Sequence, residues 1–499
     1  MKARTMLQGF EWNLPNDSAH WKRLEEKAEQ LAQLGFTDIW MPPAYKGIGG
    51  NGDVGYGVYD LYDLGEFDQK GSVPTKYGTL EEYLRVVKTM HRFGLKVLAD
   101  IVLNHKMGAD DTDRVLAAMY YPDRRKTGYK LTKKITAQTR FTFPKRNGKY
   151  SDFTWNHTHF TGVDINEDNE YPGSELNGGI RAVYKLLPAL WSLYVDRENE
   201  NYDYLMGADI NFSNPEVREE LKRWGRWYAD LVGFDGVRID AVKHIDHTYF
   251  TEWLENLRSH TGKEFFAVGE YWHPDLAMLM KYLHNSGKCM SLFDVPLHNH
   301  FFEASQKGAS YDLRTIFDHT LVQKEPWYAV TFVDNHDTQP GQMLESWVAD
   351  WFKPLAYALI LLREGGFPCV FYGDLYGTQD YEKMDYNHVS KELERYRGQP
   401  VAPCRGLEKL LLARDRYAVG RQRDYFNEYN LIGWTRGDNM AVVMSNHATG
   451  FIRMKLGKPG QMFVDLMGND TRPVYIEADG CGNFRTVGCS VSVWVPQEA

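Results

Sequence analysis

The segment Gly236-Val-Arg238-Ile-Asp240-Ala-Val-Lys243-His244 begins as a short apolar strand signal and ends in charged and polar residues. Three other segments share this form: Asp100-Ile-Val-Leu-Asn104-His105, Val268-Gly-Glu270-Tyr-Trp272 and Phe332-Val-Asp334-Asn-His336-Asp337. Each places a carboxylate or a histidine at the C-terminal end of a predicted buried strand. Because the segments lie far apart in the chain, they form one site only if the fold gathers strand ends into one mouth.

Short apolar strand signals alternate with helical ones along the chain, a pattern typical of parallel βα units. Eight strands are predicted to start near Met6, Thr37, Lys96, Gly236, Phe265, Ser291, Ala329 and Pro368. The clearest amphipathic helices are predicted over Asp17–Leu34, Leu80–Phe93, Pro215–Leu231, Lys353–Arg363 and Leu407–Tyr417, with Asp17 and Asn214 as N-caps. Eight such units predict an α/β fold, a (β/α)₈ TIM barrel whose chemistry belongs to the C-terminal strand ends.

The chain of 499 residues exceeds the length of about 250 residues that a barrel needs. We assign residues 1–103 and 207–425 to the barrel and residues 104–206 to a domain inserted after strand three. The insertion is rich in Asp, Asn, Gly and Tyr and is predicted to be irregular. Residues 426–499 carry short β segments separated by turns, which predict a C-terminal antiparallel β-sandwich.

Composition and charge narrow the class of protein. The formal net charge of −9 disfavours nucleic acid and anionic membranes as partners, because both require a basic face. Five scattered cysteines without metal-ligand spacing indicate a reducing compartment. Met1–Gln8 lacks an apolar signal stretch, and no run is long enough to cross a membrane. We expect a cytoplasmic protein, with a secreted protein whose signal has been removed as the alternative.

Residues two apart share a face of a strand, so Arg238 and Asp240 are predicted to point together into the barrel mouth. The adjacent guanidinium is expected to lower the pKa of Asp240 and keep it ionised, as a nucleophile requires. A structural salt bridge is the alternative. Lys243 and His244 add polar groups at the same strand exit and favour a functional site.

Glu270 ends the apolar run that begins at Phe265. A carboxylate in such surroundings, close to other carboxylates, is expected to have a raised pKa and to serve as a general acid. Trp272 could form a sugar-stacking wall nearby. The alternative for Glu270 is a capping or surface role.

The third acid, Asp337, follows His336 at another strand exit. His336 and Asp337 could hold two adjacent sugar hydroxyls, and His105 could do the same on another edge. Asp100 lies deeper on its strand and is expected to orient Arg238. The glycine-rich loop 47–57 lacks a P-loop lysine, so we interpret it as a rim that presents Tyr56 to a sugar face.

Three acids, Asp240, Glu270 and Asp337, suit glycoside hydrolysis, in which one carboxylate attacks the sugar and another acid protonates the leaving oxygen. Asn104, Asp203 and Asp209 are hard oxygen donors and suggest Ca²⁺. An ordinary solvated loop is the alternative for these last residues.

Taken together, the segments resemble the four signature regions of the α-amylase family, glycoside hydrolase family 13, and the resemblance covers essentially the whole chain. Val54–Phe67, Asp240–His244 and Phe332–Gly341 resemble bacterial liquefying α-amylases, whereas Asp68–Ser72 and Leu205–Gly207 look closest to the branch kept in the bacterial cytoplasm. The resemblance implies that Asp240 is the nucleophile, Glu270 the acid/base and Asp337 the transition-state stabiliser.

The resemblance also implies roles for the residues around these three acids. Arg238, His105, His336 and Tyr56 would line the subsite of the attacked glucose, with Lys243, His244 and Trp272 on the leaving-group side. Ca²⁺ would bind between the barrel and the inserted domain, on Asn104, Asp203, Asp209 and the carbonyl of His244. The resemblance implies that thermostable secreted relatives carry further acids at the positions of Thr161, Ser192 and Asn211 of this chain. We therefore expect one Ca²⁺ and lower heat tolerance.

The predicted reaction is retaining endo-hydrolysis of α-1,4-glucans such as starch, glycogen or maltodextrins, by a monomer, through a covalent glucosyl-enzyme. Retention predicts carboxyl groups about 5–5.5 Å apart. A transglycosylase, or a hydrolase of cyclodextrins, maltodextrins or α-1,6 bonds, is the alternative within the class. A non-catalytic glucan-binding scaffold is the alternative outside it, but such proteins usually lose a catalytic acid and none is missing here.

Overall fold

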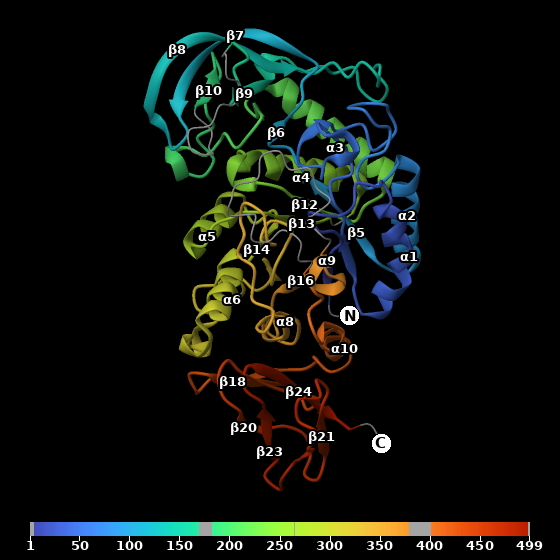
Figure 1. Ribbon diagram of the computed structural model, residues 1–499, viewed down its shortest axis with the longest axis vertical. Helices are drawn as coiled ribbons and strands as arrows, with labels where there is room; N and C mark the ends of the chain where they lie inside the picture. The colour runs from blue at the N-terminus through green and yellow to red at the C-terminus, as the bar shows by residue number, and fades with distance from the viewer. Residues whose placement is uncertain (1–3, 169–181, 264, 379–400, 498–499) are drawn as a thin grey trace.

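The structure, a computed structural model, describes residues 4–168, 182–263, 265–378 and 401–497. Eight parallel strands close into a barrel in the order β1-β16-β15-β14-β13-β12-β5-β2 (Figure 1). They are β1 (Met6–Gln8), β2 (Asp38–Trp40), β5 (Lys96–Ile101), β12 (Gly236–Ile239), β13 (Phe266–Gly269), β14 (Ser291–Phe293), β15 (Ala329–Phe332) and β16 (Phe367–Phe371). All eight predicted strands are present within a residue or two, which confirms the (β/α)₈ barrel.

Helices surround this barrel. They are α1 (His20–Gln33), α2 (Leu80–Arg92), α3 (Pro215–Val232), α4 (His247–Thr261), α5 (Leu276–Asn285), α6 (Val295–Lys307), α7 (Leu321–Lys324), α8 (Lys353–Leu361), α9 (Tyr372–Tyr376) and α10 (Leu407–Arg416). Asn214 caps α3 as predicted, because its side chain accepts from the backbone N–H of Glu216. The prediction for α1 was wrong: its N-cap is Ala19, without a side-chain cap. Ser18 takes a positive φ, so the chain turns between Asp17 and the helix.

The inserted region leaves the barrel after β5 and lies above the strand ends (Figure 1). It forms an antiparallel sheet in the order β6-β11-β9-β10-β7-β8. The strands are β6 (His105–Lys106), β7 (Asp111–Tyr121), β8 (Arg124–Arg140), β9 (Phe160–Val163), β10 (Val183–Leu186) and β11 (Ala208–Ile210). The prediction of an irregular insertion was therefore wrong. The sequence of β8 is rich in basic residues and therefore resembles a loop, although its threonines favour extended structure.

The C-terminal part is an antiparallel β-structure below the barrel (Figure 1). One sheet has the order β17-β18-β19-β24-β21-β22, and β20 pairs with β23. The strands are β17 (Gln422–Tyr425), β18 (Leu431–Arg436), β19 (Met440–Ser445), β20 (Gly450–Lys455), β21 (Met462–Asp465), β22 (Val474–Tyr475), β23 (Cys481–Thr486) and β24 (Ser490–Pro496). Because β17 precedes residue 426, the sheet starts slightly before the boundary we assigned. The three domain ranges remain predictions.

Among the described residues, none of the helices combines the length and the apolar character that crossing a bilayer requires.

A short hairpin, β3 (Lys46–Gly47) with β4 (Val58–Asp60), holds the glycine-rich loop that carries Tyr56. This hairpin places the loop near the strand ends, because the backbone N–H of Met107 donates to the carbonyl of Val58.

Candidate active site

A single arginine gathers the carboxylates at the mouth of the barrel. Arg238 lies on β12 in register with Asp100 on the neighbouring β5. Its Nη1 donates to Asp100 Oδ1 at 2.9 Å and to Asp240 Oδ1 at 2.7 Å. Its Nη2 lies 2.8 Å from Glu270 Oε2. The strand ends of β5, β12 and β13 therefore converge on one buried cation, and the predicted contact between Arg238 and Asp240 is present.

Asp100 is the anchor of this arrangement. Its carboxylate is fully buried and accepts hydrogen bonds from Trp40 Nε1 at 2.9 Å and from the Tyr56 hydroxyl at 2.8 Å, in addition to Arg238. Asp100 thus fixes both the guanidinium and the ring of Tyr56. This matches the prediction that Asp100 orients Arg238 from deeper on its strand.

The backbone at the exit of β12 holds the two neighbouring acids side by side. Asp240 N donates to the carbonyl of Ile101, and Glu270 N donates to the carbonyl of Ile239, both at 2.9 Å. Ala241 then adopts a left-handed conformation with φ +50°, an uncommon choice for a residue with a side chain. Its N–H donates to Glu270 Oε2 at 3.2 Å. A strained turn at this point is typical of functional sites.

Burial dominates the protonation of these acids. It raises the pKa of Asp240 above the usual range, although Arg238 acts in the opposite direction. The prediction that the pKa of Asp240 is lowered was therefore wrong, because its burial could not be judged from the sequence. Burial also raises the pKa of Glu270, as predicted. The charge of Asp240 raises the pKa of Glu270 further, which favours a proton on Glu270.

Asp337 and His336 follow β15 and complete the mouth. Burial and the charge of Glu270 raise the pKa of Asp337 well above its usual range. Burial lowers the pKa of His336 well below its usual range, so its ring is neutral. Gln8 Nε2 donates to His336 Nδ1 at 2.8 Å, and His336 Nε2 lies 3.4 Å from Asp337 Oδ2. The neutral ring can therefore donate from Nε2 towards Asp337.

Three parallel rings form one wall of the mouth. Tyr56 stacks on His336 with ring centroids 5.1 Å apart and on Trp12 with centroids 5.8 Å apart. His105 supports this wall, because its Nε2 donates to the backbone carbonyl of Tyr56 at 2.8 Å. The sequence analysis did not identify Trp12. It follows β1 closely, and its position after a barrel strand, which pointed to the acids, could have pointed to it as well.

The remaining predicted substrate residues link the barrel to the inserted region. Lys243 Nζ donates to Glu198 Oε2 at 2.9 Å and to the carbonyl of Trp272 at 3.1 Å. His244 Nδ1 donates to the carbonyl of Tyr202 at 2.8 Å. The sequence analysis did not identify Glu198, because a single exposed acid in an acidic stretch does not indicate a partner 45 residues away in the chain. The ring of Trp272 packs against Phe332 on β15.

Two buried carboxylates lie where the insertion returns to the barrel. Asp209 Oδ1 accepts from Asn104 Nδ2 at 3.4 Å, and its other oxygen accepts from the Thr161 hydroxyl. Asp203 Oδ2 accepts from the N–H of Ser192 at 3.0 Å. Burial raises the pKa of Asp203 to about 7. Burial and the charge of Asp203 raise the pKa of Asp209 well above its usual range.

These oxygens fit a hard cation. Two mutually repelling carboxylates and an amide are the donors that Ca²⁺ prefers. Across the described ranges, no cluster of three or more His, Cys, Asp or Glu side chains suits a metal ion, so any site must use amide or carbonyl oxygens. Thr161 and Ser192, at positions where we inferred acids in thermostable relatives, bond to Asp209 and Asp203 instead.

Comparisons with known proteins agree with this geometry. The family described as alpha amylase, catalytic domain, matches residues 9–409. An alpha-amylase of Geobacillus stearothermophilus is 46% identical, with 99% of this chain and 87% of that protein covered. The cytoplasmic alpha-amylase of Escherichia coli is 41% identical over the full length of both chains. A glucan 1,4-alpha-maltohexaosidase of a Bacillus species is 47% identical, covering 98% of this chain and 92% of that protein.

Solved structures support the fold independently. An Anoxybacillus alpha-amylase superposes with a TM-score of 0.62 at 18% identity, covering 99% of this chain and 97% of that chain. At this identity the likeness concerns the fold alone. Together with the family match over most of the chain and full-length relatives above 40% identity, it leaves one assignment: the chain belongs to the α-amylase family, glycoside hydrolase family 13.

Proposed function

We propose that this chain is an α-amylase that cleaves internal α-1,4-glucosidic bonds of starch, glycogen or maltodextrins with retention of configuration. The observation that carries the proposal is the Asp240–Glu270 pair: Arg238 contacts both carboxyls, and burial and the charge of Asp240 raise the pKa of Glu270. One carboxylate is thus prepared to attack and the other to protonate a leaving group. This is the division of labour that a retaining glycosidase requires.

In the first step Asp240 attacks the anomeric carbon while Glu270 donates its proton to the glycosidic oxygen. The bond to the leaving chain breaks, and a glucosyl ester with Asp240 forms. In the second step Glu270, now ionised, removes a proton from water, and the water oxygen displaces Asp240. One guanidinium contacts both carboxyls, through Nη1 to Asp240 and Nη2 to Glu270. This closeness supports retention, because an inverting enzyme needs room for a water between the two carboxyls.

The surrounding residues would bind the sugar and stabilise the transition state. Asp337 would stabilise positive charge on the sugar ring, with His336, His105, Arg238 and Tyr56 around the same glucose. Lys243, His244 and Trp272 would serve the leaving-group side. The side chains of Lys243 and His244 already hold groups of the inserted region, so part of their contribution would be to position that region over the cleft.

One Ca²⁺ is proposed at Asn104, Asp203, Asp209 and the carbonyl of His244. Its positive charge would balance the two buried carboxylates and hold the inserted region against the barrel. We propose no further metals in the insertion, because Thr161 and Ser192 offer a hydroxyl and a backbone N–H where acids would be needed. Lower heat tolerance than in relatives with several metals would follow.

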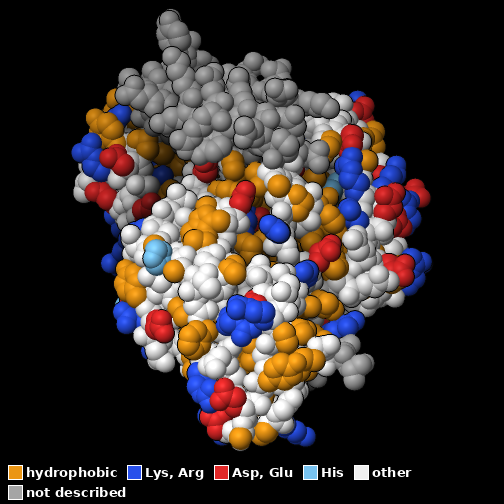
Figure 2. Space-filling view, turned by 60° about the horizontal axis from the view of Figure 1, so that its bottom comes forward, with side chains coloured by type: hydrophobic (Ala, Val, Ile, Leu, Met, Phe, Trp, Pro, Cys, Tyr) orange, Lys and Arg blue, Asp and Glu red, His pale blue; other side chains and the backbone are white. Residues whose placement is uncertain are grey.

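The proposed partner is an α-glucan, acted on by a monomer in the cytoplasm. The full-length likeness to a cytoplasmic relative and five free cysteines support that compartment. Acidic and basic side chains are interspersed on the face shown in Figure 2, which is unlike a nucleic-acid-binding surface. Cell fractionation would distinguish this location from secretion after signal removal.

The decisive assay is digestion of amylose by the wild type and by Glu270→Gln, with products followed by chromatography and NMR. Internal cleavage gives mixed maltooligosaccharides early in the reaction. Dominant release of maltohexaose would instead favour the specificity for which one relative is named. Formation of longer chains would indicate a transglycosylase, and activity confined to cyclodextrins would indicate the other alternative.

A further inference from the structure

The glycine-rich loop that carries Tyr56 folds around the side chain of Asp53. Asp53 Oδ1 accepts hydrogen bonds from the backbone N–H of Gly55 at 2.7 Å and from that of Gly57 at 3.2 Å. Asp53 Oδ2 accepts from the backbone N–H of Gly49 at 3.1 Å. Hydrogen bonds from N–H groups to a carboxylate are among the stronger ones in proteins, so this side chain fixes the path of the loop. Because Gly55 and Gly57 flank Tyr56, one oxygen holds the backbone on both sides of that tyrosine.

The glycines of this loop leave room for the carboxylate. A Cβ added at Gly47 would lie 2.2 Å from Asp53 Cγ, and one added at Gly57 would lie 2.5 Å from Asp53 Oδ2. Both separations are far shorter than van der Waals contact. Gly55 has a φ of +97°, a conformation that residues with side chains rarely adopt. The glycines therefore accommodate Asp53, a role that the interpretation of the loop as a rim did not include.

The far end of the Tyr56 side chain reaches the proposed active site. Its hydroxyl donates to Asp100 Oδ2 at 2.8 Å, and its ring stacks on that of His336 with centroids 5.1 Å apart. The backbone of this tyrosine is held by Asp53 and by His105, which bonds to the Tyr56 carbonyl at 2.8 Å. A side chain that is held at both ends keeps a fixed position towards a ligand.

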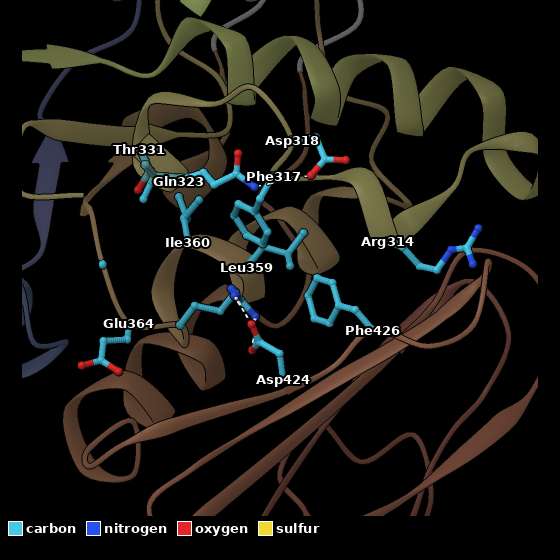
Figure 3. A pocket seen from close by; sticks show the side chains of 13 residues that line it. Arg314, Phe317, Asp318, Gln323, Thr331, Leu359, Ile360, Glu364, Asp424 and Phe426 are labelled. Atoms are coloured by element: carbon cyan, nitrogen blue, oxygen red, sulfur yellow. Dashed lines mark hydrogen bonds and ion pairs between the residues drawn. The ribbon is translucent and has the colours of Figure 1, made fainter. Parts of the chain in front are cut away.

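Two aspartates outside the barrel mouth show what is distinctive about Asp53. Asp424 accepts two hydrogen bonds from the guanidinium of Arg363, at 2.8 and 2.9 Å, and this pair lines the cavity in Figure 3. Asp465 binds backbone as Asp53 does, but it lies on β21 in the C-terminal sheet, below the barrel in Figure 1. Its carboxylate accepts from the N–H groups of four residues, Met467, Asn469, Asp470 and Val493. Asp465 is therefore a matched case, in which a carboxylate fixes a loop that carries none of the proposed site residues.

We propose that Asp53 is a positioning residue, which acts through the loop to hold the Tyr56 ring against the glucose that is attacked. The presence of that glucose rests on the proposed function. Without the carboxylate, the N–H groups on both sides of Tyr56 lose their acceptor, and the ring is free to move away from the sugar. A displacement of about 1 Å in a group that positions substrate lowers the rate by about 10²-fold. The contribution of Asp53 should therefore disappear when the tyrosine ring is absent.

The test is a double-mutant cycle on maltotetraose hydrolysis, with Asp53→Ala, Tyr56→Ala and both together. We expect Asp53→Ala to lower kcat/KM by about 10–100-fold in the wild-type background and by less than about threefold in the Tyr56→Ala background, because residues that act as a unit are not additive. Asp53→Asn keeps one acceptor oxygen and should lose only about 2–10-fold. A purely structural role would instead give the same factor in both backgrounds.

Two further variants keep the inference testable if Asp53→Ala folds poorly. Gly47→Ala leaves Asp53 in the chain but displaces its carboxylate, and it should lower kcat/KM as Asp53→Ala does. Asp465→Asn should lower Tm but leave kcat/KM within about twofold, because it lies far from the proposed site.

Equal factors in the two backgrounds of the cycle, or equal losses of kcat/KM for Asp53→Asn and Asp465→Asn, would overturn the positioning role. Failure of the wild type to hydrolyse maltotetraose or amylose would overturn the proposed function instead.

Discussion

Lys353 and Arg238 are buried cations that each contact carboxylates of this barrel. The two sets of carboxylates differ in number and in exposure to solvent. Lys353 on α8 lies 2.9 Å from Asp334 Oδ2 and also contacts Asp374. The Tyr357 hydroxyl donates to Asp374 at 2.6 Å, and the Thr338 hydroxyl donates to Asp334 at 2.9 Å. The side chains of both acids are fully buried. The Lys353 cluster, Asp334 with Lys353 and Asp374, is closed to substrate.

The Arg238 cluster consists of Asp100, Arg238, Asp240 and Glu270. It differs from the Lys353 cluster in the number of carboxylates around the cation and in their exposure to solvent. Here one cation faces three carboxylates, and Arg238 Nε has no partner among the described residues. The side chains of Asp240 and Glu270 remain 12% and 10% exposed. Three carboxylates around one cation repel one another, and the two that are partly exposed remain available to a ligand.

Exposure of the acids distinguishes a catalytic ion cluster from a structural one. Where two carboxylates share one cation and neither reaches solvent, the cluster fixes the backbone, and the Lys353 cluster holds the loop that leads to Asp337. Where three carboxylates share one cation beside a cleft, two of them remain open to a ligand, and burial and mutual repulsion raise their pKa values. Four substitution or solution experiments test this comparison.

Glu270→Gln should lower kcat/KM by about 10²–10⁴-fold, the usual contribution of a general acid. Stability should not fall, because the substitution removes a carboxyl whose ionisation is disfavoured by burial. Initial rates on maltooligosaccharides and urea unfolding would measure the two effects. Activity within tenfold of wild type would remove Glu270 from its proposed role.

Lys353→Met should lower the free energy of unfolding by about 3–5 kcal/mol, because it leaves two buried carboxylates without their cation. The pH dependence of the remaining activity should keep its shape, since Lys353 contacts none of the three proposed catalytic acids in the described structure. Lys353→Arg is the charge-preserving control. A shifted pH profile with unchanged stability would reverse the roles of the two clusters.

Removal of Ca²⁺ with a chelator should lower Tm, since a ligand at a hundred times its Kd stabilises the folded state by about 2.7 kcal/mol. In the metal-free chain burial raises the pKa of Asp203 from 3.8 to about 7. The folded state then keeps a proton that the unfolded state releases, so stability should fall as pH rises from about 4 to about 7. Excess Ca²⁺ should flatten this slope. Identical curves with and without Ca²⁺ would contradict the proposed site.

Tyr357→Phe and Tyr56→Phe each remove one hydroxyl that donates to a cluster carboxylate. Each should cost about 1.5–3 kcal/mol of stability, the value of a hydrogen bond to a charged group. Only Tyr56→Phe should also reduce kcat/KM, because Asp100 then holds Arg238 less firmly. Equal activity losses in the two variants would weaken the distinction between the clusters.

Much of the fold could be predicted because apolar runs bounded by polar residues mark the barrel strands directly. Strand periodicity likewise identified Arg238 and Asp240 as neighbours, and depth on the strand identified Asp100 as the anchor. The length of β8 was missed, because its exposed faces carry lysines and arginines that resemble a loop. The Lys353 cluster was missed for another reason: Asp334 and Lys353 meet only through the packing of α8 on the barrel.

Protonation was the least predictable property. The sequence shows that Arg238 lies beside Asp240, which predicts a lowered pKa, but it does not show how far both are removed from water. Burial outweighs the arginine, and the pKa of Asp240 rises instead. For Glu270 the apolar run before it already signalled burial, so the direction was predicted correctly.

The anomeric form of the first product shows whether Asp240 and Glu270 act as nucleophile and acid/base of a retaining reaction. Proton NMR during the first minutes of maltooligosaccharide hydrolysis distinguishes the two anomers before they interconvert. If Asp240 attacks the anomeric carbon and Glu270 protonates the leaving oxygen, the new reducing end appears as the α-anomer. Initial release of the β-anomer would contradict the account.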